Sequence, residues 1–330
     1  MHSSLIAWIL RAIPFGTIIM YGALGETVTE KSGNLNLGVP GIMYLGGFAG
    51  FASAWAYENT AANPSGAVSV VVALTCAILA SMAGGLIYAF LTISLRANQN
   101  VTGLALTTFG MGVANFFGVF ILNGASYSAA PIANKAFSAK IPVLSTLGSF
   151  GQVVFSYGFL VYAAIALAIA LHWFLTRTRA GLNLRAVGEN PATADAAGIN
   201  VTLYKYLATC IGAGICGIGG LYYVLDYNQG IWATTGQIEA LGWLAVALVI
   251  FTTWKPLNAI WGAYLFGMLY WLYQFLPTLL GITMASHITD LVQMLPYVVT
   301  IVVLIVVSMR KKKENQPPAH LGLAYFREER

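Results

Sequence analysis

Long apolar segments separated by short polar connections dominate the chain. They lie at about residues 5–25, 35–57, 67–94, 101–122, 152–175, 204–226, 238–253, 257–276 and 289–309. Most are long enough for a helix to cross a hydrocarbon core of about 30 Å. One such run could be a buried core helix, but eight or nine in 330 residues predict an all-α polytopic membrane protein. We expect about 8–10 transmembrane helices, a membrane domain at 1–309 and a charged tail at 310–330.

Composition agrees with this class. Hydrophobic residues make up 58% of the chain and charged residues only 8%, whereas a soluble domain carries roughly 25% charged residues. The first residues lack a basic n-region and place Arg11 inside an apolar run, so they do not read as a cleaved signal peptide. Arg11 leaves two alternatives for the first segment, a full span or an interfacial helix, and therefore leaves the side of the N-terminus open.

Basic residues sort to one side of the predicted membrane. Alternating the segments from a cytoplasmic C-terminus places these residues inside: Lys31, Arg96, Arg177, Arg179, Arg185, Lys205, Lys255 and 310–313. Only Lys135 and Lys140 remain as basic residues in the outer connections. This asymmetry predicts a multi-pass protein of the cell membrane with a cytoplasmic C-terminus. It also explains the net charge of +5 without nucleic-acid binding.

Other features of the sequence indicate how the chain is organised. The connection 123–151 is the longest on the outer side, and the Pro-rich charged tail is expected to extend into the cytoplasm. Gly-dense stretches at 32–51 and 234–251 each lead into a helix, one in each half. This weak pattern is typical of a duplicated transporter core, in which discontinuous or re-entrant segments occur.

The sequence lacks the common catalytic, nucleotide-binding and metal-binding motifs. The sequence has no phosphate-binding GxxxxGK[ST], no HExxH, no metal-spaced Cys/His cluster and no nucleophile–base pair. We therefore expect a protein that is not an enzyme and that binds no metal or cofactor of its own.

The polar stretch GENPATADAAGIN at 188–200 predicts a short capped helix. Asn190 is a favourable N-cap, Pro191 takes the first helical position, and Gly198 can end the helix in the left-handed conformation. Two interpretations follow for this helix, which is too short to span. It either ties two spans together at the interface, or it docks into a cleft on a soluble partner.

A family resemblance favours the second interpretation. RAVGENPATADAAGINV resembles the cytoplasmic coupling loop of permease subunits of ATP-binding-cassette importers, in the branch for branched-chain amino acids, sugars and nucleosides. GETVTEKSGNLNLGVPGIMYLGGFAGF resembles that branch's N-terminal motif, and residues 96–112 and 241–268 match in spacing and order. The end, PPAHLGLAYFREER, is similar to tails of nucleoside-type permeases. The resemblance covers nearly the whole chain.

The resemblance implies a type II-like permease with a two-fold pseudo-repeat and a coupling loop at 176–203. It implies a second, non-identical permease, a cytoplasmic ATPase that binds ATP and Mg, and an extracellular or periplasmic substrate-binding (lipo)protein. The coupling positions carried over are Gly188, Glu189, Asn190, Pro191, Asp195, Ala197 and Gly198. The N-terminal motif positions are Gly25, Glu26, Glu30, Ser32, Gly33, Asn36, Gly38 and Gly41.

One position departs from the family pattern. Many relatives carry an acidic residue where this chain has Pro40. Because a proline biases the preceding residue away from the helical region, we expect the following helix to begin near Gly41. Glu26, Glu30 and Lys31 either form an interfacial salt-bridge cluster or buttress the coupling loop.

Polar residues in or beside the apolar segments are candidates for the substrate path. They are Asn98, Asn100, Thr107, Thr108, Asn115, Glu239 and Trp243. Glu239 and Trp243 are one helical turn apart and share a face, so a carboxylate and an indole could hold a hydroxylated ring. Interfacial anchoring of Trp243 is the alternative.

The predicted function is import of nucleosides by alternating access. A permease for ribose-like sugars or another small solute is the alternative within the family. A stand-alone ion-coupled transporter would need an acidic relay deep in the membrane, whereas the acidic residues here fall at or near the predicted segment ends.

Overall fold

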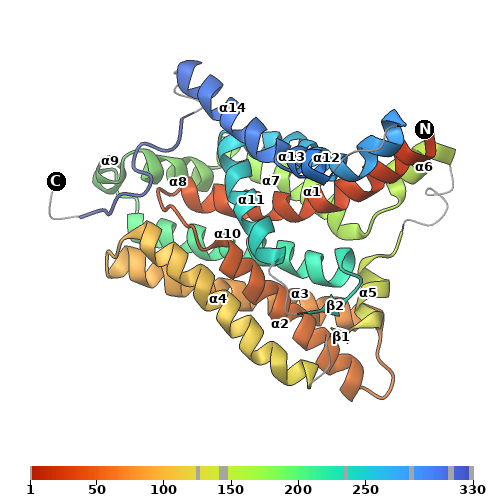
Figure 1. Cartoon of the computed structure of the whole chain (residues 1–330). Coiled ribbons are helices and arrows are strands. Elements are labelled where there is room, and N and C mark those ends of the chain that lie inside the picture. The colour runs from red at the N-terminus through yellow and green to blue at the C-terminus, as the bar shows by residue number, and fades with distance from the viewer. Residues whose placement is uncertain are drawn as a thin grey trace.

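The computed structural model describes residues 2–123, 127–140, 148–233, 237–281, 286–310 and 316–326. These residues form an almost entirely helical protein (Figure 1), which confirms the predicted all-α class. The α-helices are α1 (His2–Glu30), α2 (Val39–Thr60), α3 (Gly66–Ala89), α4 (Gln99–Leu122), α5 (Pro131–Phe137), α6 (Gly148–Phe155), α7 (Phe159–Arg177), α8 (Arg179–Glu189), α9 (Pro191–Ala196), α10 (Val201–Tyr222), α11 (Gln237–Phe251), α12 (Pro256–Leu280), α13 (Ser286–Gln293) and α14 (Leu295–Arg310). Two π-helical segments, η1 (Phe90–Ser94) and η3 (Tyr223–Tyr227), extend α3 and α10.

Within the described residues, five helical stretches are long and apolar enough to cross a membrane by length and composition: Ser4–Glu30, Gly66–Ser94, Gln99–Leu122, Phe159–Arg177 and Val201–Tyr227. α2 and α12 also have spanning length, 22 and 25 residues, but their many Gly, Tyr and Trp residues lower their hydropathy. The apolar segment at 289–309 is divided between α13 and α14. Pro296 lies in the first turn of α14, where its missing N–H breaks no helical hydrogen bond.

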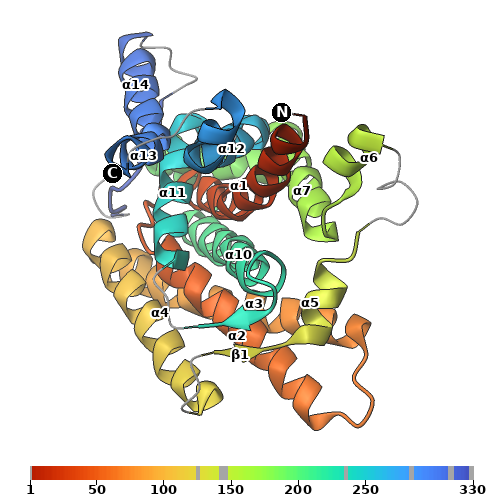
Figure 2. The ribbon, with the colours of Figure 1, turned by 45° about the vertical axis from the view of Figure 1, so that its right-hand side comes forward.

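The core forms around α10, which packs against α1, α2 and α3. Figure 2 shows α10 at the centre, between α1 on one side and α2 and α3 on the other. Small residues permit this close packing: a Cβ on Gly25 would lie 2.3 Å from the Gly212 carbonyl oxygen, and one on Gly220 would lie 1.9 Å from that of Met43. Such small-residue contacts are the usual means of helix association where lipid removes the hydrophobic drive.

One helix starts earlier than the sequence analysis expected, and another extends beyond its apolar segment. α2 begins at Val39 rather than near Gly41, because Pro40 occupies the first turn, where a missing N–H costs nothing. α1 continues to Glu30, five residues beyond the end of the first apolar segment, because its polar end is buried inside the protein.

The two ends of the molecule are formed by different elements. α8, α9 and the C-terminal residues lie at one end, and the start of α1 lies at the other (Figure 1). With 29 residues, α1 is about 44 Å long, so it joins the two ends. The N-terminus therefore lies opposite the coupling loop.

The described part of the connection between α4 and α7 contains β1, α5 and α6. β1 (Ser128–Ala129) pairs with β2 (Ile231–Trp232) in an antiparallel ribbon, and α5 follows β1. The Glu58 carboxylate at the end of α2 accepts hydrogen bonds from the Ile132 and Ala133 main-chain N–H groups at 3.1 and 2.6 Å. An acidic side chain at a helix N-terminus is electrostatically favourable, so Glu58 fixes α5 to α2.

Candidate functional site

Two consecutive short helices, α8 and α9, and residues 197–200 make up the segment for which the resemblance implies coupling, called the coupling region from here on. Thr178 caps α8 by accepting a hydrogen bond from the Gly181 N–H at 3.0 Å, and Asn190 caps α9 through the Thr193 N–H at 3.0 Å. Gly198 has φ +81°, a left-handed conformation that ends α9. The predicted short helix with its Asn190 cap, Pro191 start and Gly198 stop is confirmed, with Ala197 at its C-cap.

The sequence analysis missed α8. Its signal was present in the Thr178 cap and in Leu184 and Val187, which are buried and three residues apart. Because residues three apart share a helix face, these two side chains turn one face of α8 inward. The coupling region is therefore a pair of helices with a buried side.

Gly188 holds α8 directly against the end of the N-terminal motif. A Cβ at this position would lie 2.3 Å from the Lys31 carbonyl oxygen and 3.2 Å from the Gly33 main-chain nitrogen. No side chain fits in that space, so the absence of a Cβ lets the two backbones touch. The backbones of α8 and of the residues after α1 are thus in direct contact.

The N-terminal motif is a buried, hydrogen-bonded turn that joins α1 to α2. Glu26 Oε1 accepts from the Asn36 main-chain N–H at 2.9 Å, and Asn36 Oδ1 accepts from the Gly38 N–H at 2.9 Å. The Trp254 indole N–H donates to Glu30. Glu26, Glu30 and Ser32 are almost fully buried, so the acidic residues support the turn beneath the coupling region.

Glycines of this motif set close approaches and one sharp turn. A Cβ on Gly41 would lie 2.3 Å from the Leu106 carbonyl oxygen, so α2 and α4 pack closely there. Gly33 has φ +88°, which only glycine adopts readily, and its carbonyl oxygen accepts the Gly322 N–H at 3.1 Å.

The C-terminal tail, defined here as residues 316–326, folds back onto the coupling region. The His320 main-chain N–H donates to the Gly188 carbonyl oxygen at 3.0 Å, and the Ala319 N–H lies 3.4 Å from Glu189 Oε2. The Tyr325 hydroxyl donates to Asp195 Oδ2 at 3.0 Å. The described tail thus lies against α8 and α9, and its predicted extension into the cytoplasm stays a prediction.

Apolar side chains explain the folding back of the tail. Val187, Ala194 and Val201 form a small buried cluster, against which Tyr325 and Ile199 pack. Leu321 packs against the main core. The described tail contains no Lys, Arg, Asp or Glu, so burial of these apolar groups favours its position against the protein.

Charged groups around the coupling region are partly shielded from water. Burial and the neighbouring Arg185 lower the pKa of the Lys31 ammonium, and Glu189 opposes this by favouring the charged form. Burial and the nearby Lys205 lower the pKa of the His320 imidazole. Both shifts arise because burial penalises a charge and like charges repel.

The candidate substrate-path residues do not gather in one place. Asn98 caps α4 through the Val101 N–H at 3.1 Å, and Thr107 is buried and donates to the Leu37 carbonyl oxygen at 3.0 Å. Asn100, Thr108 and Asn115 are exposed on α4.

Glu239 and Trp243 lie on α11, far along the chain, and both are partly buried. Glu239 is beside Tyr44 of α2, and the Tyr223 hydroxyl donates to Oε1 of Gln237, two residues before Glu239. The start of α11 thus carries one carboxylate and one amide and lies beside the tyrosines Tyr44 of α2 and Tyr223 of η3.

Comparison with known proteins identifies the family of the chain. Residues 8–306 match the family model described as the permease component of branched-chain amino acid transport systems. A putative glucose ABC transporter permease, TsgC13, of Haloferax volcanii is 35% identical over 272 residues, 81% of this chain and 77% of that protein.

Two further relatives carry nucleoside names. The nucleoside ABC transporter permease NupC of Lactococcus lactis is 30% identical over 292 residues, 88% of each chain. The guanosine ABC transporter permease NupQ of Bacillus subtilis is 33% identical over 253 residues, 74% of this chain and 75% of that protein.

Proposed function

Given that the chain belongs to the permease family of branched-chain amino acid transport systems, we propose that it forms half of the path by which an ATP-driven importer takes up nucleosides. Its family members are transport subunits that contain no ATPase of their own. The site that carries the proposal is the coupling region, where Gly188 joins a short capped helix to the buried end of α1.

The partners proposed for this chain follow from that role. A cytoplasmic ATPase binds ATP and Mg and contacts α9, and a second, non-identical permease completes the path. A substrate-binding (lipo)protein delivers the nucleoside from outside. Ala192, Ala196 and Ala197 are exposed on or beside α9, and such small side chains permit close approach of a partner's surface.

The mechanism is alternating access without covalent chemistry. Closure of the ATPases on ATP displaces α9, and the backbone contact between Gly188 and Lys31 passes this displacement to the end of α1. The packing of α1 against α10 and α12 then shifts the path between its two open states. The C-terminus lies on the ATPase side in this scheme, since the tail contacts α8 and α9.

Two observations support nucleosides as the substrate. NupC matches 88% of each chain and NupQ is also a nucleoside-type relative. The start of α11 offers rings and hydrogen-bonding groups in Tyr44, Tyr223, Gln237 and Glu239. A neutral ring with hydroxyl groups fits such a surface, because the rings stack and the polar groups hydrogen-bond.

A sugar is the second candidate substrate, favoured by the identity of 35% to the putative glucose permease. The deciding experiment is uptake of a radiolabelled purine nucleoside by cells with and without the gene. Unlabelled nucleosides, ribose, glucose and amino acids serve as competitors. A parallel sample receives a proton uncoupler while glycolysis maintains ATP.

We expect gene-dependent uptake that survives the uncoupler and is competed only by nucleosides. Competition by glucose or ribose alone would keep the importer and change its substrate. Loss of uptake with the uncoupler would instead indicate an ion-coupled transporter. A Glu239→Gln variant tests the α11 surface, because loss of a carboxylate acceptor should raise the nucleoside KM while leaving the chain inserted.

A further inference from the structure

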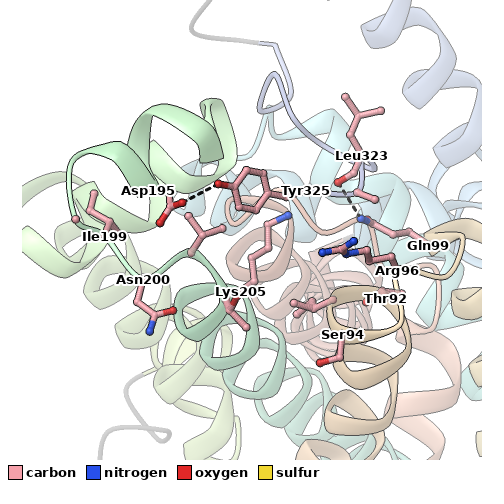
Figure 3. Close-up of a pocket in the computed structure, with 15 residues that line it drawn as sticks. Thr92, Ser94, Arg96, Gln99, Asp195, Ile199, Asn200, Lys205, Leu323 and Tyr325 are labelled. Carbon is pink, nitrogen blue, oxygen red and sulfur yellow. Dashed lines mark hydrogen bonds between the residues drawn. The ribbon is translucent and has the colours of Figure 1, made fainter. Parts of the chain in front are cut away.

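A polar cavity lies between the coupling region and the tail. Its volume is about 570 Å³, and its walls come from η1, the starts of α4 and α10, residues 195–200 and the tail. Figure 3 shows the labelled side chains around this space, with Lys205 and Arg96 directed toward it from different elements. The volume falls within the range of about 300–1,000 Å³ that is typical of small-molecule sites.

Lys205 is an unusual residue for such a wall. Its side chain is only 3% exposed, yet it lines the cavity. Among the residues that the structure describes, no hydrogen-bond acceptor or carboxylate pairs with its ammonium group. Buried lysines are normally paired, so Lys205, which has no such partner among the described residues, is suited to bind an anionic ligand that enters the cavity.

Arg96 provides a second cation at the same cavity. The residue adopts φ 56°, and its guanidinium group lies 4.5 Å from the centre of the Phe326 ring in the tail. Stacking on the ring holds the guanidinium plane, while its N–H groups stay available for a ligand. An Arg and a Lys together are the usual combination for a phosphate group, since Arg binds in a bidentate manner and Lys acts as a point charge.

Two other residues that line the cavity restrict the chemical class of ligand that it can bind. Asn200 uses its Oδ1 to accept the Leu203 N–H, which leaves its amide N–H groups for a ligand. The Asp195 carboxylate also lines the cavity and accepts the Tyr325 hydroxyl. A carboxylate disfavours a bare anion but accepts hydrogen bonds from hydroxyl groups. The cavity is also larger than a phosphate ion needs.

We propose that this cavity binds a phosphate ester that carries hydroxyl groups, with its phosphate between Lys205 and Arg96 and a hydroxyl at Asp195. This chemistry has two sources, a soluble nucleoside monophosphate and the headgroup of a phosphatidylglycerol lipid. The site is separate from the transport path proposed above and does not depend on the identity of the imported substrate. Because the tail forms one wall, an occupied site holds the tail against the coupling region.

The test uses the full-length chain purified in detergent. Binding of radiolabelled AMP and of inorganic phosphate is measured by scintillation proximity, and binding of phosphatidylglycerol against phosphatidylcholine by native mass spectrometry. The variants are Lys205→Met, which removes the charge at similar length, and Lys205→Arg, which keeps it. Lys135→Met on α5, at the other end of the protein, is the matched control.

We expect one of the two phosphate esters to bind, with affinity at least tenfold lower in Lys205→Met and retained in Lys205→Arg and Lys135→Met. AMP binding assigns a soluble ligand, and selective phosphatidylglycerol binding assigns a lipid. Binding of neither ester, or equal binding to Lys205→Met and the parent chain, overturns the proposal.

If Lys205→Met does not fold, the exposed Arg96→Gln variant replaces it with the same expected loss. The bound ester should also slow proteolysis of the tail in the parent chain. Nucleoside uptake by the same variants is measured separately, so failure of this site and failure of the proposed import are distinguishable.

Discussion

Tyr325 donates a hydrogen bond to Asp195, which lies 130 residues earlier in the chain, with 3.0 Å between the two oxygen atoms. This bond fastens the end of the protein to the short helix that we propose contacts the ATPase. The two residues therefore belong to one structural unit, the coupling region with its tail.

Removal of the Tyr325 hydroxyl should loosen the tail. The Tyr325→Phe variant keeps the ring in its small apolar cluster and loses one hydrogen bond worth about 1 kcal/mol. We expect the fraction of molecules with an undocked tail to rise roughly fivefold, as measured by hydrogen exchange of residues 318–326. Tyr297→Phe on α14 is the control, and equal exchange in both variants would show that the hydroxyl contributes nothing.

Charge reversal in the coupling region should abolish transport. In Glu189→Lys and Asp195→Lys, the carboxylates that accept from Ala319 and Tyr325 are replaced by cations. Nucleoside uptake should fall to background while the chain remains expressed and inserted, as membrane fractionation would confirm. Unchanged uptake in both variants would refute the docking role of α9.

Two glycines of the coupling region should respond differently to alanine. Gly188→Ala places a Cβ 2.3 Å from the Lys31 carbonyl oxygen, so α8 must separate from the end of α1 and uptake should be lost. Gly198→Ala meets no atom within 4 Å and only strains a left-handed residue at about 1 kcal/mol. Uptake by Gly198→Ala should stay within a few-fold of the parent, and similar losses in both would argue against the backbone contact.

Docking of the tail should weaken at acid pH. His320 has a pKa below its ordinary value of 6.5 in the docked state, because of burial and the nearby Lys205. The free tail therefore takes up a proton at higher pH than the docked tail, and linkage favours release as the pH falls below about 6.5. Docking is fully stable above that pH and weakens toward the lower pKa of the docked form.

Proteolysis of the tail between pH 7.5 and 5.5 measures this effect. The parent chain should be cut faster at the lower pH after correction for protease activity. A His320→Gln variant, which cannot be protonated in this range, should lose the dependence. A dependence of equal size in that variant would assign it to another group.

Removal of the Glu26 side chain should destabilise the whole protein. Glu26 is 1% exposed and accepts the Asn36 N–H. Glu26→Ala leaves that N–H unpaired and opens a void, at a cost of about 2–3 kcal/mol. Glu26→Gln keeps an acceptor oxygen and should unfold closer to the parent in thermal unfolding in detergent; equal loss in both would mean that the charge itself is required.

The sequence predicted those features whose causes are local. Asn190, Pro191 and Gly198 define α9 because capping and chain reversal depend on neighbouring residues only. The docking of the tail was not predicted, because it depends on pairing with Gly33, Gly188 and Asp195, which lie far away in the chain. Its apolar residues at 321 and 325 were visible in the sequence, but their partners were not.

In the candidate site, too, the features that depend on tertiary packing could not be predicted from the sequence. The closeness of Gly188 to Lys31 follows from the tertiary packing of α8 on the end of α1, which no residue spacing reveals. The sequence shows where each glycine lies, but it does not show which helices meet at that glycine. The roles of the substrate-path residues and the two-fold pseudo-repeat stay predictions.

α1 reaches from the end opposite the coupling loop to the turn beneath α8. Its part after Pro14, from Phe15 to Glu30, is about 24 Å long. It can therefore act as a lever arm: a tilt of about 5° at one end displaces the other by about 2 Å over that length. In the proposed mechanism, a small stroke of the ATPases against α9 would therefore become a displacement of about 2 Å at Phe15, without any change in the fold of α1.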